Sequence, residues 1–285
     1  MKGMIIVCAG VMLAACKGLP PSEIKFGRYG ELHASKPDFA RVEHEFPLAL
    51  ADFAKLTPET LSAYDQEQID QIYARLAAGA IPDGLFDGSA FSPKDTSGNR
   101  LAAGFADGLP DIAARIKTTK FELLRKYLWS KKVFYRDSRL ARNRVENMAS
   151  LEHLVSGDLK TVPTITVNGQ KQWLMFPARL YCGQSLLDSR RESIIIDYSY
   201  NEEIPGYRER PDSLAGRRGM QVRDEIRMIR PGFYLGRAYL GKIFLLNFTL
   251  YNKELAERHA PEYPKTGKTR QDCWPGEQAR SAVHR

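Results

Sequence analysis

The chain has few of the residues and none of the short motifs that carry most enzyme chemistry. Its 285 residues include only four cysteines and five histidines, and the histidines are scattered. It contains no Gly-x-Ser-x-Gly elbow, Walker loop, dinucleotide-binding Gly-x-Gly-x-x-Gly or His-Glu-x-x-His pattern. We therefore predict no catalytic residues, no metal site and no cofactor. A hydrolase-type enzyme, built on a Cys182–His153 pair or on Asp197, stays an alternative.

Long hydrophobic runs are also missing. The apolar stretch from Gly3 to Met12 is about half of the roughly 20 residues that span a bilayer as a helix, and nothing later is longer. With Lys2 before it and small residues after it, this stretch has the order of an export signal. We expect residues 1–15 to be a signal peptide.

The end of this signal is more specific. Leu13-Ala14-Ala15-Cys16 resembles the lipobox of bacterial lipoproteins. The resemblance implies cleavage before Cys16 and lipid attachment to it, which would hold the protein stably on a membrane. Lys17 stands where many lipoproteins of the inner membrane have aspartate, so the resemblance implies the periplasmic face of the outer membrane.

Two thiols remain after removal of Cys8 and acylation of Cys16. In an oxidising periplasm Cys182 and Cys273 can form a disulfide that ties the C-terminal tail to the body. The alternative is a buried Cys182 and a loose Cys273.

Positive charge is concentrated in one region. From Arg115 to Arg144 there are eleven Lys or Arg residues against two acids. The cluster includes aromatic residues, which in a cytosolic protein would suggest nucleic-acid binding. In an exported protein it favours an anionic membrane surface or a periplasmic protein partner and no nucleic acid. The predicted surface residues are Arg125, Lys126, Trp129, Lys131 and Lys132.

The pattern of apolar residues predicts an α+β fold. Residues 16–50, rich in proline, read as a tether and lead-in, and residues 51–252 as one domain with helices at about 58–78 and 110–128. The part from 160 to 252 is β-rich and antiparallel, and its sheet can close like a barrel with the N-terminal helices packed on it. Residues 253–285 form a polar tail, ordered only if Cys273 or Trp274 docks.

Two short stretches resemble a known kind of barrel. Gly84-Leu85-Phe86-Asp87-Gly88 is similar to the Gly-x-Trp-x-Gly opening of small calycin-like β-barrel proteins, with Phe86 in place of tryptophan. Residues 128–134, LWSKKVF, resemble the strand that follows in some of them, with Lys131 in place of glycine. The resemblance implies a ligand-holding barrel.

The last strands suggest where a ligand would bind. Residues 222–252 alternate with period two between turns at Pro231-Gly232 and Gly241-Lys242, which predicts a three-stranded meander. One face of it is apolar and the other mixes Arg, Asn, Thr and Tyr, so we expect the mixed face to line a cavity. The candidate ligand-binding residues are Arg227, Arg237, Asn247, Tyr239 and Asp197.

Function is less determined than fold. An arginine in an apolar pocket suits the acidic head of an amphiphile such as a fatty acid or phospholipid. The alternative is an Arg–Asp pair that merely satisfies the mixed face. We expect a non-catalytic, lipid-anchored protein that binds a lipid or another amphiphile. The second hypothesis is a periplasmic protein-interaction factor that uses the basic surface of residues 115–144.

Overall fold

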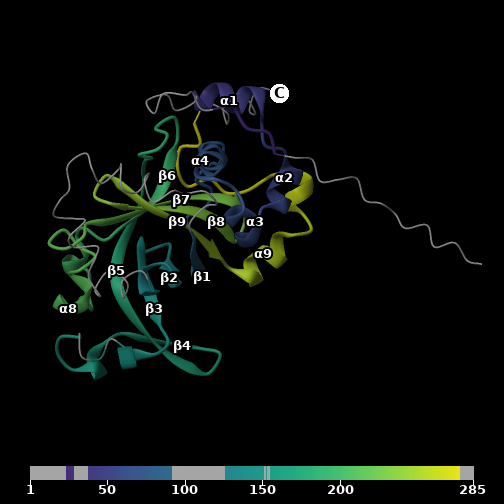
Figure 1. Cartoon of the computed structure of the whole chain (residues 1–285). Helices are drawn as coiled ribbons and strands as arrows, with labels where there is room; N and C mark the ends of the chain where they lie inside the picture. The colour runs from purple at the N-terminus through teal and green to yellow at the C-terminus, as the bar shows by residue number, and fades with distance from the viewer. Residues whose placement is uncertain (1–23, 29–37, 92–125, 151, 153–154, 277–285) are drawn as a thin grey trace, which may run out of the picture.

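One antiparallel sheet forms the centre of the protein, with most of its helices grouped on one side of it (Figure 1). The computed structural model describes residues 24–28, 38–91, 126–150, 152 and 155–276. The strands are β1 (Gly84–Phe91), β2 (Lys131–Tyr135), β3 (Leu140–Val145), β4 (Thr164–Val167), β5 (Gln170–Gln184), β6 (Glu192–Asp197), β7 (Val222–Arg230), β8 (Phe233–Leu240) and β9 (Ile243–Tyr251). The α-helices are α1 (Phe39–Glu45), α2 (Leu50–Lys55), α3 (Pro58–Ser62), α4 (Gln66–Ala74), α8 (Glu209–Asp212), α9 (Lys253–His259) and α10 (Tyr263–Thr266). Short 3-10 helices are η1 (Met148–Ser150), η3 (Leu159–Thr161) and η4 (Asn201–Glu203).

The sheet closes on itself. Its strand order is β3-β2-β1-β9-β8-β7-β6-β5-β4, and β3 also pairs with β5. All strands except β4 therefore form an eight-stranded antiparallel barrel in which neighbours in the chain are neighbours in the ring and β9 returns to β1. Closure leaves no strand edge of the ring unpaired. This confirms the α+β fold with a barrel-like antiparallel sheet.

Glycine turns determine the register of the later strands. The predicted meander is present as β7, β8 and β9, with Gly232 and Gly241 at positive φ in its two turns. The β4–β5 hairpin turns at Asn168 and Gly169, with φ of 50° and 76°, as the Asn-Gly dipeptide predicts. This hairpin extends away from the ring, at the bottom of Figure 1.

The predicted helix at 58–78 is two helices. Thr57 caps α3, with Pro58 at its first position, and the chain then leaves the helix until the Asp65 side chain accepts a hydrogen bond from the backbone of Gln68 and starts α4. Aspartate is a strong N-cap, so it begins a new helix instead of continuing the first. The predicted helix at 110–128 lies outside the described residues except for 126–128. No helix in the described part of the chain has the length and apolarity needed to cross a bilayer.

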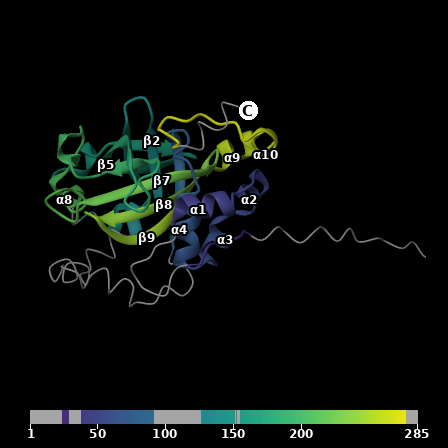
Figure 2. The same cartoon turned by 90° about the horizontal axis from the view of Figure 1, so that it is seen from above.

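Two hydrophobic cores follow from this arrangement. The larger fills the barrel. The smaller lies between the helices and the outer face of β7 and β8, where Ile69, Ile72 and Leu76 pack on Ile229, Phe233 and Leu235. Viewed from above, α1, α3 and α4 lie beside β8 and β9 (Figure 2). The outer face of these strands is therefore an internal layer of the protein.

One end of the barrel is closed by two chain segments. The hydroxyl group of Tyr234 donates to the carbonyl oxygen of Ala80 at 2.6 Å, and the amide of Ile81 donates to the carboxylate of Asp272 at 2.8 Å. A disulfide joins Cys182 on β5 to Cys273, so of the two arrangements that the sequence left open the structure contains the disulfide. The part of the tail that the structure describes, to residue 276, is thereby attached to this end.

Candidate functional site

The predicted ligand arginines lie outside the barrel. Arg227 is fully buried between α4 and the sheet. Its guanidinium donates to the carbonyl oxygens of Tyr73, Asp188 and Arg191 at 2.9–3.1 Å and to the hydroxyl of Ser193 at 3.0 Å. It also lies 3.5 Å from the Asp188 carboxylate. These contacts join three chain segments.

Arg237, Tyr239 and Asn247 occupy the same outer layer. Arg237 forms an ion pair with Asp70 of α4 and donates to the Tyr239 hydroxyl at 3.0 Å. The Asn247 side chain donates to Gln66 of α4 at 2.8 Å. The sequence pattern separated the two faces of the meander correctly except at the start of β9. A register shift there places Phe244 beside Arg237 and Tyr239 on the mixed face, and Leu245 in the barrel core. The expected orientation was wrong, because the apolar face lines the barrel and the mixed face packs against α4.

Asp197 is not brought to these arginines. Its carboxylate accepts hydrogen bonds from the Tyr181 hydroxyl and from the amide of Ser199, both at 2.8 Å. The hydrogen bond with Asp197 is one cause, after burial, that raises the pKa of Tyr181 to about 12. The five predicted ligand residues therefore do not form one site.

The predicted basic surface is divided by the barrel wall. Trp129, in the turn before β2, and Lys132 on β2 are buried inside, at 1% and 0% exposure. Lys132 points inward because consecutive strand residues point to opposite faces. Lys131 points outward and pairs with Glu146. The Lys126 ammonium lies 5.3 Å from the centre of the Tyr127 ring. Arg125 and the lipobox Cys16 lie outside the described residues.

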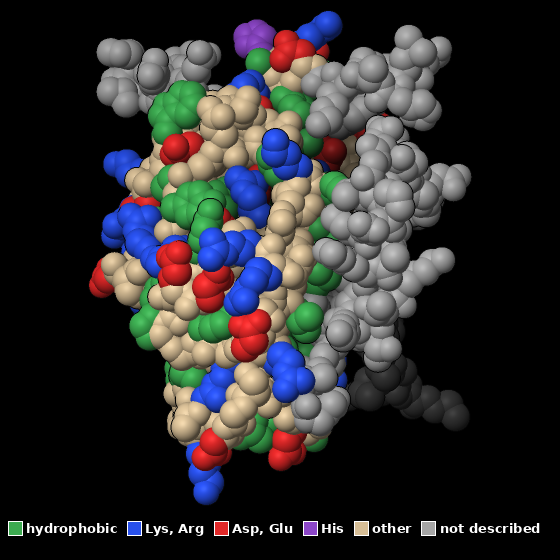
Figure 3. Space-filling model, turned by 90° about the vertical axis from the view of Figure 1, so that its left-hand side faces the viewer, with side chains coloured by type: hydrophobic (Ala, Val, Ile, Leu, Met, Phe, Trp, Pro, Cys, Tyr) green, Lys and Arg blue, Asp and Glu red, His purple; other side chains and the backbone are tan. Residues whose placement is uncertain are grey.

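Charge on one outer face is mixed. On the face with η4 and α8, Lys and Arg side chains alternate with Asp and Glu (Figure 3). Two ion pairs join these elements to the loop after α8: Arg217–Glu202 and Arg218–Glu209. This face presents no field of one sign.

The barrel interior contains a buried polar cluster, formed by Trp129, Lys132, Asn143, Tyr198 and Asp224. Each of the five side chains is at most 1% exposed. They come from β2, β3, β7 and the residues next to β2 and β6, all near one end of the barrel. Apolar residues such as Phe86, Ile196 and Phe248 belong to the same core.

Hydrogen bonds connect this cluster. The Lys132 ammonium donates to Tyr198 at 2.5 Å, to the side-chain oxygen of Asn143 at 3.2 Å and to the carbonyl oxygen of Leu128 at 2.6 Å. The Asn143 amide donates to the carbonyl oxygens of Tyr127 and Leu128, both at 2.8 Å. Backbone oxygens of one short segment therefore satisfy donors from two strands.

Asp224 is the only carboxylate of the cluster. One of its oxygens accepts from the Trp129 indole at 2.9 Å. The other lies 3.7 Å from the Lys132 ammonium and has no hydrogen bond from the described residues. Burial raises the pKa of Asp224 to about 6 in spite of Lys132, and burial lowers the pKa of Lys132 to about 8 in spite of Asp224.

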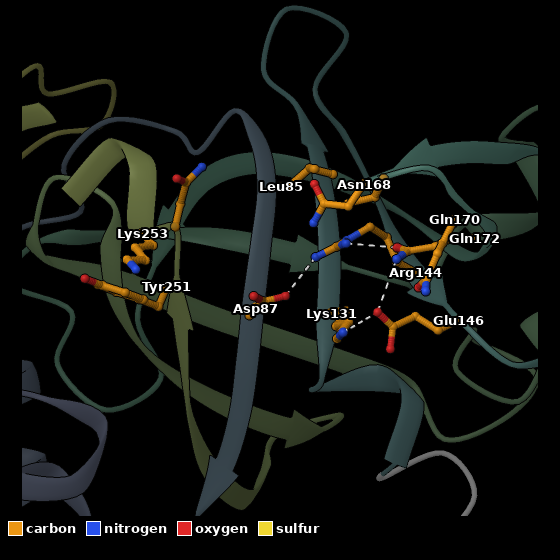
Figure 4. Close-up of a pocket in the computed structure, with 12 residues that line it drawn as sticks. Leu85, Asp87, Lys131, Arg144, Glu146, Asn168, Gln170, Gln172, Tyr251 and Lys253 are labelled. Atoms are coloured by element: carbon orange, nitrogen blue, oxygen red, sulfur yellow. Dashed lines mark hydrogen bonds and ion pairs between the residues drawn. The ribbon is translucent and has the colours of Figure 1, made fainter. Parts of the chain in front are cut away.

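A second feature is a polar groove on the outside of the barrel. It has a volume of about 260 Å³ and lies between the outer faces of β1 to β3, the β4–β5 hairpin and the start of α9 (Figure 4). Arg144, with only 4% of its side chain exposed, lies at its base and pairs with Asp87 at 2.9 Å. Both Lys131 and Glu146 also line it.

The cysteines do not form a metal site. Among the described residues one group has the spacing of metal ligands, Cys182, Glu192 and Cys273. Its two sulfurs are bonded to each other, and a disulfide offers no thiolate to a metal.

Sequence reasoning placed Lys132 and Trp129 on a surface and did not notice Asn143, Tyr198 or Asp224 as partners. The signal that could have found them is period two across residues 131–135, which puts Lys132 on the same face as Phe134. The partners come from distant strands, and only the closed ring brings them together.

Comparison of the chain with protein-family models, with curated proteins and with solved structures found no match.

Proposed function

We propose that this protein is an exported, lipid-anchored binding protein whose barrel holds the acidic head of an amphiphile at Lys132 and Asn143. The observation that carries the proposal is that carbonyl oxygens of residues 127 and 128 occupy the donors of both side chains. A carboxylate or phosphate offers two or more oxygens of the same kind. Such a head would replace the two carbonyls when this segment moves aside.

The energetics of the polar cluster support a role beyond stability. A buried lysine and aspartate lose solvation that their mutual attraction seldom restores, and well-packed apolar residues are often as stable or more stable. Ionisable groups with shifted pKa values inside an apolar container are characteristic of binding and catalytic sites. A stability role alone would be served better by apolar residues.

The surroundings favour an amphiphile over a small polar ion. The head would contact Lys132 and Asn143 near one barrel end, while the remaining inner wall is apolar and aromatic, including Phe86, Phe134 and Phe248. A charge-assisted hydrogen bond from the ammonium would fix the head, and the chain would displace part of the apolar core that fills the barrel. Lipidation at Cys16 would keep the protein at the membrane that supplies such a molecule.

Binding can be tested on protein that lacks residues 1–16, since the described fold begins later in the chain. Native mass spectrometry after addition of a C16 fatty acid should detect one bound molecule per chain. Lys132→Met should weaken binding at least tenfold, because the substitution keeps the stem and removes the ammonium. Lys242→Met is the matched control, because Lys242 is exposed in the β8–β9 turn near the same barrel end, and it should bind as the original chain does.

The double variant Lys132→Met/Asp224→Asn covers the case in which the single variant folds poorly, because it also removes the unpaired carboxylate. Absence of any bound fatty acid would contradict the proposal. Equal binding by folded Lys132 variants and by the control would contradict the role of Lys132.

A further inference from the structure

The polar groove outside the barrel is chemically different from the interior. It is separated from the buried polar cluster by the barrel wall, since Lys131 lines the groove and its neighbour Lys132 points inward. In Figure 4 the side chains of Asp87, Arg144 and Gln172 point toward one another across β1 and β3. Tyr251 and Lys253 lie to their left, and the Tyr251 hydroxyl points away from them.

Side-chain amides form a third of the lining, beside five charged side chains. Four of them belong to the groove: Asn168, Gln170, Gln172 and Asn252. Each amide offers both donors and acceptors, which is what a molecule rich in hydroxyl groups requires, because each hydroxyl also donates and accepts. Only Leu85 and Val167 contribute aliphatic side chains, so an acyl chain has little surface to contact.

The charges of the groove largely compensate each other. Arg144 pairs with Asp87, and Lys131 pairs with Glu146. With Lys253 there are three cations and two carboxylates. A strongly anionic ligand would meet both carboxylates and a cationic one would meet Arg144, so the balance favours a neutral ligand.

The base of the groove is held in a fixed arrangement. Arg144 donates to the Gln172 side-chain oxygen at 2.9 Å, and the Gln172 amide donates to Glu146 at 3.2 Å. These bonds determine which way the Gln172 amide points and orient Glu146. Asp87 is held by Arg144 although 73% of its side chain is exposed, so much of this carboxylate faces solvent. Pre-oriented polar groups lower the entropic cost of binding.

From this arrangement we propose that the groove binds a neutral saccharide, independently of any ligand inside the barrel. Exposed carboxylate and amide oxygens would accept from sugar hydroxyls, and Lys131, Lys253 and the amides would donate to them. The volume of about 260 Å³ lies just below the roughly 300–1,000 Å³ of drug-sized ligand pockets. One or two sugar rings fit this size.

The test uses the full chain in a detergent that has no sugar headgroup. Saturation-transfer NMR with maltose, N,N′-diacetylchitobiose and glucuronic acid as probes should show transfer to a neutral disaccharide. Asp87→Ala/Gln170→Ala should weaken that binding at least fivefold, because both changes remove exposed polar groups of the groove. The matched control is Asp137→Ala/Gln184→Ala, with the same residue types at exposed positions elsewhere, and its affinity should be unchanged.

Three results would overturn the inference: no probe binds, glucuronic acid alone binds, or the folded groove variant binds as tightly as the control. Fatty-acid binding is measured on the same preparations. The groove variant should bind the fatty acid as the original chain does, so failure of the groove proposal can be told apart from failure of the barrel proposal.

Discussion

The two sides of the barrel wall both contain buried charges, but they satisfy them differently. On the outside, Arg227 donates to three backbone carbonyls that are fixed by secondary structure or by tight loops, and Asp188 lies beside it. On the inside, Lys132 depends on a carbonyl of the segment that precedes β2, and one oxygen of its partner Asp224 has no hydrogen bond from the described residues. The outer arginine joins several elements, whereas the inner lysine contacts the buried segment before β2 and side chains of the polar cluster.

This difference separates structural charges from candidate binding groups. Five guanidinium donors in a planar fork suit a permanent junction between several acceptors. A lysine ammonium is a point charge whose pKa shifts readily on burial, and it can exchange one oxygen partner for another. Burial of a charge is therefore not enough to identify a ligand site. The identity of its partners, backbone or side chain, is more informative.

The largest expected loss of stability comes from substituting a buried arginine outside the barrel. Arg227→Leu should lower the free energy of unfolding by about 3–5 kcal/mol, because it leaves buried acceptors without donors. Urea denaturation followed by circular dichroism measures this. Arg227→Lys should recover only part of the loss, because an ammonium cannot reach all the acceptors. A loss below about 1 kcal/mol would show that the outer arginine does not join α4 to the sheet.

The inner side should respond to pH instead. In the folded protein the pKa of Asp224 is raised to about 6, so its contribution to stability falls as pH rises from about 4 to 6. The pKa of Lys132 is lowered to about 8, so its contribution recovers as pH rises from about 8 toward 10. Between pH 6 and 8 both groups are charged. In this window the polar cluster should lower the free energy of unfolding by on the order of 2 kcal/mol, compared with more acidic or more basic pH.

This window is measured as the difference in unfolding free energy between the original chain and Lys132→Met/Asp224→Leu, because other titrating groups cancel in that difference. The variant should gain most at pH 7 and least at pH 5 and pH 9.5. A pH-independent difference would contradict the assignment. The outer arginines keep their charge over the whole range, so Arg227→Leu should lose the same stability at each of these pH values.

The sequence was informative wherever local rules apply. Asn168-Gly169 and Gly241-Lys242 determine hairpins by turn chemistry alone, and alternation separated the two faces of residues 222–252 except at the bulge near Phe244. Which face turns inward depends on ring closure, through pairings such as Gly88 with Leu250. These join residues far apart in the chain, and no local pattern encodes them.

The first strand of the barrel also depends on a tertiary contact. Gly84–Phe91 is strand β1, although it contains two glycines, Gly84 and Gly88. Gly88 is needed because a Cβ there would lie 2.5 Å from the carbonyl oxygen of Trp129. That residue precedes β2, so the requirement is tertiary and the sequence shows only its consequence.

The smallest loss of stability is expected from removing a solvent-exposed ion pair. Arg179 on β5 pairs with Glu203 at 3.1 Å, with about half of each side chain exposed. Arg179→Ala should change the unfolding free energy by about 0.5 kcal/mol or less, because water screens the pair and both side chains lose entropy in forming it. A double-mutant cycle with Glu203→Ala measures the coupling directly. Coupling above about 1 kcal/mol would mean that geometry, and not burial, decides which ion pairs stabilise this barrel, and the distinction between its two sides would then lose its basis.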